Sequence, residues 1–335
     1  MTPSVSVLIP VYNVEAFIEK CLRSVLRQDY PNMEVILVND CSTDRSIALA
    51  EEVITHENPQ RHKIQIAHHE QNRGIAATRA TALGLATGEY LLFLDSDDYW
   101  DNDSVVSHWV ATALQTDSPI VISDYVVDYP KQKIHQSVLE IKTGREYIQA
   151  ILSGRQPAFL WNKFIRRKEW EEWNGGFVEG LALLEDYRSV IPFLYHIDRI
   201  GYLHTPTVHY VQQNSSSLTH KINMKQKRDL EAVLEYLSHY LLVEQKEEDF
   251  APYIGRAYIN IKMMLFNRIH VRDYPIVRSI HPEYDRLLSS LPQSTLNKCI
   301  HIHIKCIYKL QSTSPWGYLG WLLLKVREGV KKVIR

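Results

Sequence analysis

One stretch decides the fold and places the chemistry: residues 88–100, with the sequence GEYLLFLDSDDYW. It begins with a glycine and continues with the five apolar or aromatic residues 90–94, a run typical of a short strand buried on both faces of a parallel sheet. Three aspartates follow within four residues, so they lie at the C-terminal end of this strand, the edge where open α/β sheets bind ligands. Carboxylates this close repel one another unless a divalent cation joins them, and such a cation takes further ligands from phosphate and water. The alternative is an acidic loop that caps the next helix, with Asp101 or Asp103 as the N-cap residue.

Strand patterns and helix patterns alternate along the chain with short connections. Before the stretch, strands are expected at 4–9, 34–39 and 64–67, and helices at 15–28, 45–54 and 75–86. After it, we expect a helix at 103–115, a strand at 119–123, a hairpin within 125–142, a helix at 187–195, strands at 200–204 and 208–211, and helices at 230–243, 253–269 and 296–310. The first strand is expected to stop at Pro10. This alternation predicts the α/β class, with a doubly wound, mainly parallel sheet and a C-terminal α-helical extension.

Composition excludes several classes of protein. The chain has 335 residues, 45% of them hydrophobic, which is enough for a full core, and its net charge of −1 gives no reason to expect a nucleic acid as partner. The four cysteines show no paired spacing, which argues against a disulfide framework or a zinc site and fits a reducing compartment. We expect no signal peptide, because a strand pattern follows Met1 almost at once, and no spanning helix, because no apolar run reaches about 18 residues. The expected location is the cytoplasm.

Polar residues follow the other strands at the same sheet edge. Tyr12 is suited to stack on a base, Asp40 to accept hydrogen bonds from the base, and Arg73 to meet a phosphate. Neither a G-x-G-x-x-G nor a G-x-x-x-x-G-K-[ST] motif is present, so the phosphates are not held in the dinucleotide or P-loop manner. A cation at the aspartate loop can share that task.

Four motifs in order resemble the nucleotide-sugar-binding half of family 2 inverting glycosyltransferases, which have the GT-A fold. They are VSVLIPVYN (5–13), VILVNDCSTD (35–44), NRGIAATRA (72–80) and GEYLLFLDSDD (88–98). The resemblance covers residues 4–125 and extends more weakly to 219. It implies a nucleoside-diphosphate sugar as donor, most plausibly a UDP-sugar, and a glycan or lipid-linked acceptor.

The resemblance also assigns residues to the donor and to the metal. The donor contacts would come from Pro10, Tyr12, Asp40, Arg73, Gly74, Asp95 and Ser96. Among them, Pro10, Tyr12 and Asp40 would hold the nucleoside. Asp97, together with Asp95, would bind the divalent cation, Mn²⁺ or Mg²⁺.

A second acidic pair, Glu185-Asp186, matches the family's E-D motif, in which the aspartate is the usual general base. An inverting transfer is a single displacement in which the acceptor hydroxyl must lose its proton, so the mechanism needs a base, and Asp186 is the candidate. The alternative is that both acids only favour the dipole at a helix N-terminus. The family usually has glycine just before this pair, whereas this chain has Leu184.

Three further residues are singled out by the sequence, and for some of them a purely structural role is an alternative. Trp161 and Lys163 resemble a W-x-K segment of the family. Trp161 also fits a core aromatic, and we expect Lys163 to have an anionic partner, either Asp186 or a phosphate. His209 is expected to be a packed residue.

The predicted organisation is a GT-A domain at 1–220, divided into a nucleotide-sugar half at 1–125 and an acceptor half at 126–220, followed by a helical extension at 221–335. The extension ends in aromatic residues, leucines and a basic amphipathic segment after Pro315. This pattern fits either an interfacial helix on an anionic membrane, at the inner face of the plasma membrane, or a helix docked on its own domain.

The sequence therefore predicts a metal-dependent inverting glycosyltransferase of the hexosyl or N-acetylhexosaminyl type, acting in cell-surface polysaccharide biosynthesis. One rival is a sugar nucleotidyltransferase, which would carry a glycine-rich basic loop that residues 10–14 lack. The other is a noncatalytic nucleotide-sugar-binding subunit of a polysaccharide assembly complex, which would not need Asp186.

Overall fold

Strand β4 (Tyr90–Phe93) lies beside β1 (Val5–Val11) in the middle of the sheet, and both strands are buried along their whole length. They run parallel, with Val5 opposite Tyr90 and Leu8 opposite Phe93. A glycine is needed at position 88 because a Cβ there would lie 2.6 Å from the backbone nitrogen of Ser6. The expectation of a strand buried on both faces is confirmed.

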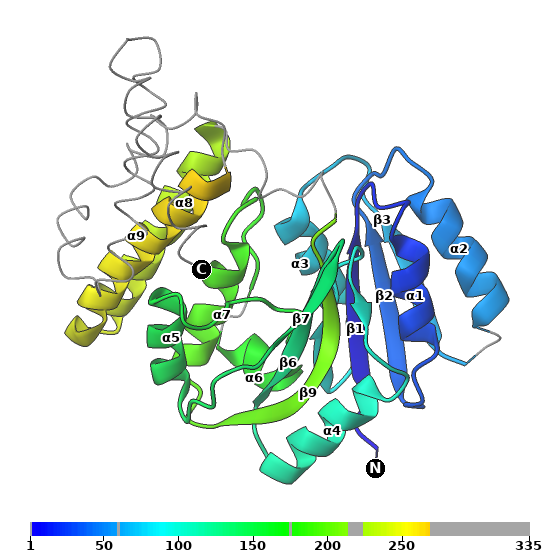
Figure 1. The fold of residues 1–335 in the computed structure, drawn as a ribbon, viewed down its shortest axis with the longest axis horizontal. Helices are drawn as coiled ribbons and strands as arrows, with labels where there is room; N and C mark the ends of the chain where they lie inside the picture. Colours follow the sequence, from blue (N-terminus) through cyan, green and yellow to red (C-terminus); the bar gives the residue numbers. More distant parts are fainter. Residues whose placement is uncertain (1, 59–60, 174–175, 214–223, 269–335) are drawn as a thin grey trace, which may run out of the picture.

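The structure, a computed structural model, describes residues 2–58, 61–173, 176–213 and 224–268 (Figure 1). In this part of the chain one sheet has the strand order β3-β2-β1-β4-β8-β6-β9-β5, and β7 pairs with β6. Its nucleotide half is parallel and consists of β3 (Lys63–His68), β2 (Met33–Asn39), β1 and β4.

The other half of the sheet is mixed. Strand β8 (Lys163–Arg166) runs antiparallel to both of its neighbours, β4 and β6 (Ile120–Tyr129). Strand β9 (Ile200–Val211) is parallel to β6, and the short β5 (Tyr99–Trp100) pairs with its end. Strand β7 (Gln132–Gln136) forms the expected hairpin with β6. Strand β8 runs opposite to β4, and β6 runs opposite to β8. Strand β6 and the parallel β9 therefore end at the same edge as β4.

Helices cover both faces of the sheet and make two apolar cores. One core contains residues of α1 (Ile18–Leu26), α2 (Ser46–Glu57) and α4 (Val105–Thr116). The other contains residues of α3 (Ile75–Leu85), α5 (Gly144–Leu152), α6 (Arg167–Glu172) and α7 (Glu185–Tyr195). The doubly wound arrangement predicted from the alternating pattern is therefore present.

The helical extension packs on the second core. Helices α8 (Met224–His239) and α9 (Ala251–Arg268) contribute buried residues such as Leu234 and Ile254 to it. A π-helical turn at Tyr240–Glu244 and a 3₁₀ turn at Glu248–Phe250 connect them. In Figure 1 the two helices lie beside α5 and α7, away from β1–β3.

Two local expectations were wrong, and some elements were not predicted, among them β8 and α6. Strand β1 continues through Pro10 to Val11. Proline has no backbone N–H to donate, but the pairing of β1 with β4 already ends at Leu8, so no hydrogen bond of that ladder is lost. Residues 200–211 form one strand rather than two, with an irregularity opposite Ser123 and Tyr125. Helix α5 was not predicted, although a Thr143–Glu146 capping box marks its start.

Several expectations lie outside the described residues: the serine-rich loop at 214–219, the helix at 296–310 and the basic segment after Pro315. In the ranges that are described, no helix has the length and apolar character needed to cross a bilayer.

Candidate active site

The predicted donor residues gather at the C-terminal ends of β1, β2 and β4. Tyr12 follows β1 and has 48% of its surface exposed, so its ring is accessible for stacking, whereas Pro10 is buried within the strand. Asp95, Ser96 and Asp97 follow β4. Ser96 is buried and both aspartates are half-buried.

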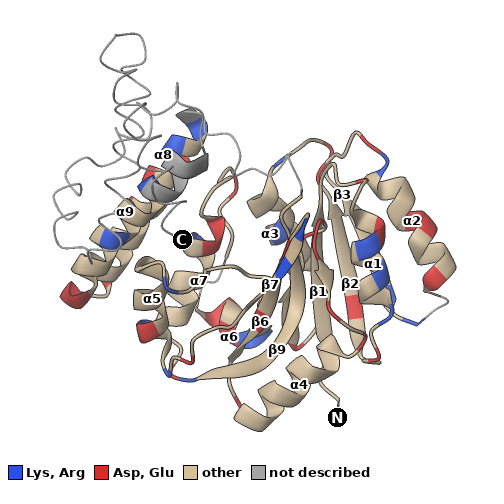
Figure 2. Ribbon diagram, in the orientation of Figure 1, with Lys and Arg blue, Asp and Glu red and all other residues tan. Residues whose placement is uncertain are grey.

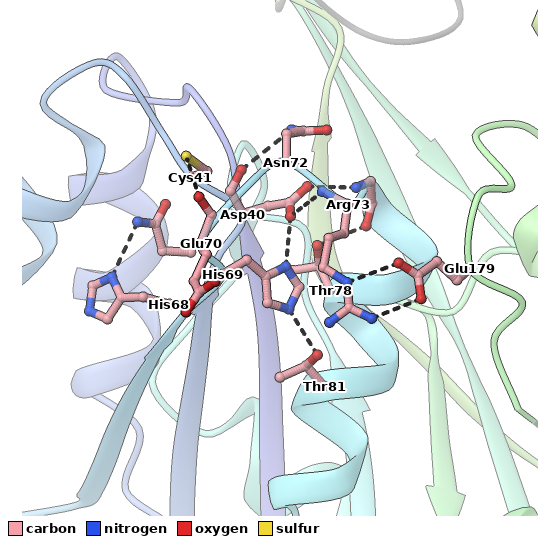
Figure 3. Close-up of polar contacts among 12 residues, drawn as sticks. Asp40, Cys41, His68, His69, Glu70, Asn72, Arg73, Thr78, Thr81 and Glu179 are labelled. Carbon is pink, nitrogen blue, oxygen red and sulfur yellow. Dashed lines mark hydrogen bonds and ion pairs between the residues drawn. The ribbon is translucent and has the colours of Figure 1, made fainter.

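Asp40, which follows β2, is held by the start of α3 (Figure 3). Its carboxylate accepts hydrogen bonds of 2.8 Å from the backbone N–H groups of both Arg73 and Gly74. Its Oδ1 also lies 2.7 Å from Nδ1 of His69, whose Nε2 lies 2.9 Å from the hydroxyl of Thr81. The structure thus brings together Asp40, Arg73 and Gly74, and it adds His69, which the sequence reasoning missed.

Arg73 makes a contact that the sequence did not suggest. Its guanidinium donates two hydrogen bonds, of 2.9 and 2.8 Å, to the carboxylate of Glu179, on the segment that leads to α7 (Figure 3). Both side chains are exposed. Arg73, which was predicted to bind a phosphate, therefore has a carboxylate partner in the structure.

Arg79 on α3 joins the two acidic motifs. Its side chain is only 3% exposed, and its guanidinium donates to Asp95 at 2.7 Å and to Glu185 and Asp186 at 2.8 Å each. Figure 2 shows acidic ribbon in red at the start of α7 and basic ribbon in blue on α3. Arg79 could have been recognised from the sequence, because it lies in an alanine-rich, buried helical segment and a buried arginine needs anionic partners.

The electrostatics of this group favour a proton-accepting role for Asp186. Burial raises the pKa of Asp186, and the charge of Arg79 opposes that shift by stabilising the carboxylate. Burial, followed by the charge of Asp186, raises the pKa of Glu185. Clustered, buried carboxylates with shifted pKa values beside a ligand edge are typical of catalytic sites.

The residue before the acidic pair explains the family's preference for glycine. Leu184 has φ 59° and ψ 22°, the left-handed conformation that glycine adopts without steric cost. The helix begins directly after it, so Glu185 and Asp186 lie in the first turn of α7. The backbone geometry that a glycine would give is therefore present with leucine.

Lys163, at the start of β8, was expected to bond an anionic partner, but its hydrogen bonds go to neutral oxygens. Its ammonium donates to the carbonyl oxygens of Pro157 and Phe159 and, at 3.0 Å, to the side-chain oxygen of Asn162. Burial lowers its pKa to about 7, and the charge of Asp186 partly offsets this effect. Lys163 thus shapes the segment before β8 and lies within electrostatic reach of Asp186.

The aspartate loop has the donor set of a site for a hard cation. Asp95 has one oxygen bonded to Arg79, and Asp97 is half-buried beside it. Within the described ranges, no group of three or more His, Cys, Asp or Glu residues is placed to hold a metal without help. This fits the mode in which Mg²⁺ or Mn²⁺ takes one or two carboxylates and completes its shell with substrate phosphates and water.

Asp98 completes the loop as a buried acid that the sequence reasoning did not select. Its Oδ1 accepts a 2.8 Å hydrogen bond from the N–H of Val211 at the end of β9, while its Oδ2 is buried with no hydrogen-bond partner in the described structure. Burial and the charges of Asp97 and Asp95 raise its pKa well above the usual value. Asp98 therefore ties β9 to the aspartate loop. The capping alternative for Asp101 or Asp103 is not borne out, since the N-cap of α4 is Ser104.

His209 and Trp161 are packed, as expected for core residues. His209 stacks on Tyr99 at 4.4 Å between ring centroids and bonds to Asp101 at 2.7 Å. Trp161 has 2% of its surface exposed.

Comparisons with known proteins agree with this geometry. The family model described as "Glycosyl transferase family 2" matches residues 6–173. Two Bacillus subtilis proteins named as glycosyltransferases are similar over most of the chain. EpsH is 31% identical over 257 residues, which cover 74% of this chain and 72% of EpsH. EpsJ is 30% identical over 279 residues, which cover 80% and 78% of the two chains.

Among solved structures, that of Staphylococcus aureus TarS 1–349 in complex with UDP-GlcNAc has a similar fold, with a TM-score of 0.58 and 19% sequence identity over 84% of this chain and 88% of that one. At this identity the similarity bears on the fold alone, and it supports the GT-A architecture. The motifs, the sheet that places them at one edge, the family model and the two relatives agree, and the chain belongs to glycosyl transferase family 2.

Proposed function

We propose that this protein transfers a hexosyl or N-acetylhexosaminyl group from a nucleoside-diphosphate sugar, most plausibly a UDP-sugar, to a hydroxyl of a glycan or lipid-linked acceptor, with inversion. The observation that carries the proposal is the position of Arg79, which bonds Asp95 of the aspartate loop and Asp186 of the acidic pair at once. A donor-binding edge and a candidate base in one buried cluster are what a single displacement requires.

The chemistry can be assigned to this chain's own groups. Asp186 accepts the proton of the acceptor hydroxyl as its oxygen bonds to the anomeric carbon of the donor, and the bond from that carbon to the diphosphate oxygen breaks on the opposite side. Asp97 and Asp95 would hold Mn²⁺ or Mg²⁺, which supplies charge neutralisation for the leaving diphosphate. Tyr12 and Asp40 would position the nucleoside.

Similar proteins support a role in cell-surface polysaccharide biosynthesis. The names of three bacterial proteins that match about 100 residues each refer to teichuronic acid biosynthesis (TuaG), colanic acid biosynthesis (WcaA) and poly(ribitol-phosphate) N-acetylglucosaminyl transfer (TarS). The UDP-GlcNAc in the TarS complex supports a UDP-sugar as donor here. Each match covers about a third of this chain, so the donor sugar and the acceptor are open to test.

The test is a panel of UDP-, GDP- and dTDP-sugars with Mn²⁺ or Mg²⁺, in which released nucleoside diphosphate and thermal stabilisation are measured for the full chain and for Asp186→Asn. We expect one donor to be turned over, turnover to be lost with chelator, and Asp186→Asn to abolish turnover while nucleotide binding stays within a few-fold. Nucleotide binding without turnover in the unsubstituted chain would instead identify a binding subunit. An absence of any nucleotide effect would reject the donor site.

Membrane contact is a separate proposal. We infer from the basic amphipathic pattern after Pro315 that the C-terminal segment contacts anionic lipid at the cytoplasmic face. Flotation with anionic liposomes should retain the full chain and lose a chain ending at Ser314. Equal partitioning of the two would reject the contact.

A further inference from the structure

Four aromatic rings meet at the site edge, on the side of the aspartate loop away from the nucleoside residues. This aromatic cluster consists of Tyr125, Phe159, Trp161 and Tyr210. Phe159 stacks on Trp161 at 4.7 Å between centroids, and Tyr125 meets Trp161 edge-on at 4.9 Å. Trp161 is buried behind the other three rings, which are half-buried and keep accessible surface.

The register of the sheet places the cluster beside the aspartate loop. Leu92 of β4 is opposite Phe164 of the antiparallel β8. The turn that contains Trp161 precedes β8 at the edge where Asp95 follows β4. Tyr210 precedes Val211, whose N–H bonds Asp98 at 2.8 Å. The cluster is thus tied to the aspartate loop from two strands.

The candidate base is joined to the same loop, because Arg79 bonds both Asp186 and Asp95. The ammonium of Lys163 donates to the carbonyl oxygen of Phe159, and its charge interacts with that of Asp186. Across the sheet the order is therefore nucleoside residues on β1 and β2, carboxylates after β4, and the aromatic cluster on the β8, β6 and β9 side. An acceptor that attacks opposite the leaving diphosphate has to approach from that third position.

The chemistry of the aromatic rings limits the kinds of ligand that the cluster can bind. Aromatic faces bind the C–H face of a pyranose ring, and tyrosine hydroxyls at the rim can bond sugar hydroxyls. An open-chain polyol has no flat face of this kind. A half-buried cluster contributed by three separate segments is also better suited to a fixed ring than to a flexible chain.

We propose that the aromatic cluster is the acceptor subsite and that it binds a pyranose ring of the acceptor by stacking, next to Asp186. The inference rests on the proposed function, because it names the acceptor class for the same site. Phe159 is the residue to vary, since it is half-buried, contacts both Trp161 and Tyr210, and belongs to no ion-pair group of the site.

The experiment compares Phe159→Leu, which keeps an apolar side chain but removes the ring, with Phe159→Tyr, which keeps the ring. Tyr129→Ala is the matched control, because Tyr129 is an aromatic residue of β6 that is 39% exposed and outside the aromatic cluster. Saturation-transfer NMR measures binding of methyl β-D-glucopyranoside, methyl N-acetyl-β-D-glucosaminide and ribitol to the full chain. Thermal shift with UDP and Mn²⁺ reports the donor site separately.

We expect Phe159→Leu to weaken binding of a pyranoside about tenfold, Phe159→Tyr and Tyr129→Ala to leave it within about twofold, and all three to keep the UDP shift. Pyranoside binding that is indifferent to Phe159→Leu, absent from the parent chain, or matched by ribitol would overturn the subsite. A parent chain without a UDP shift would reject the proposed function instead.

Discussion

Nη1 of Arg79 lies 2.8 Å from Oδ1 of Asp186, across 107 positions of sequence. The contact joins α3, from the nucleotide half, to α7, from the acceptor half. Because Arg79 also bonds Asp95, the candidate base is oriented by the same cation that holds the aspartate loop. The charge of Arg79 favours the deprotonated form of Asp186, which is the form that can accept a proton.

Substitution of Arg79 should change the pH dependence of activity. Arg79→Met removes the charge that opposes the upward shift, so the pKa of Asp186 rises further and the acid limb of kcat/KM moves to higher pH. We expect kcat/KM near neutral pH to fall about 100-fold or more. Arg188→Met is the control, because Arg188 is on α7, the helix of Asp186, but lies over the ring of Tyr236. An unshifted acid limb in Arg79→Met would contradict this role.

The acid limb of the unsubstituted enzyme has a predicted position as well. As the proposed base, Asp186 would act only when deprotonated, and burial raises its pKa, so activity should rise with pH through a midpoint above the ordinary aspartate value of about 3.9. The measurement is kcat/KM against pH at constant ionic strength. A midpoint at or below the ordinary value would argue against Asp186 as the base.

His69 should support nucleoside binding through Asp40. His69→Ala removes one of the groups that hold the Asp40 carboxylate, and we expect the Kd for UDP to rise about fivefold, the equivalent of one lost hydrogen bond. His68→Ala is a neighbouring control, because His68 is exposed and bonds only Asn39 among the described contacts. Titration calorimetry with UDP compares them, and equal Kd values for the two variants would exclude a positioning role for His69.

Arg73 and Glu179 should act on phosphate binding in opposite directions. Arg73→Gln removes a cation and should weaken UDP binding, whereas Glu179→Gln removes the carboxylate that competes with phosphate and should strengthen it by a few-fold. Uridine, which lacks phosphate, should bind all three chains alike. An equal effect on uridine and UDP would show that the pair acts on the fold rather than on the phosphate.

Glu34 should make stability depend on acid pH. Its carboxylate, on β2, accepts hydrogen bonds from Ser6, Thr87 and Lys63. Burial alone would raise its pKa, but these bonds outweigh that effect and lower the pKa to about 2. The folded value lies below the unfolded value of about 4.3, so the stabilisation is present above that pH and is lost as pH falls toward 2.

Urea unfolding at several pH values measures this contribution. Glu34→Gln should lower the free energy of unfolding near neutral pH and flatten its dependence between about pH 5 and 2. Glu52→Gln, at a position 59% exposed and paired only with Arg45 among the ion pairs described, should change neither. A Glu34→Gln protein with an unchanged pH slope would be inconsistent with the shifted pKa.

Local patterns were enough for the nucleotide half of the fold. The apolar run at 90–94, the alternation before it and the aspartates at its end are properties of neighbouring residues, and burial on both faces follows from them. They were less reliable where long-range pairing decides the outcome. Strand β1 runs through Pro10 because β4 has already ended beside it, and residues 200–211 stay in one strand because β6 pairs along both parts.

The sequence by itself determined where the acidic residues are, that the segments around residues 4–9, 34–39, 64–67 and 90–94 are strands, and that the aspartates follow β4. Only the tertiary structure decided that Arg79 meets Asp95, Glu185 and Asp186, that His69 holds Asp40, and that Tyr125, Phe159, Trp161 and Tyr210 form one aromatic cluster. The physical reason is the distance along the sequence over which each effect acts. Periodicity records which face of one element is apolar, whereas a buried charge is paired by whichever element packs against it, and that partner can lie more than a hundred residues away.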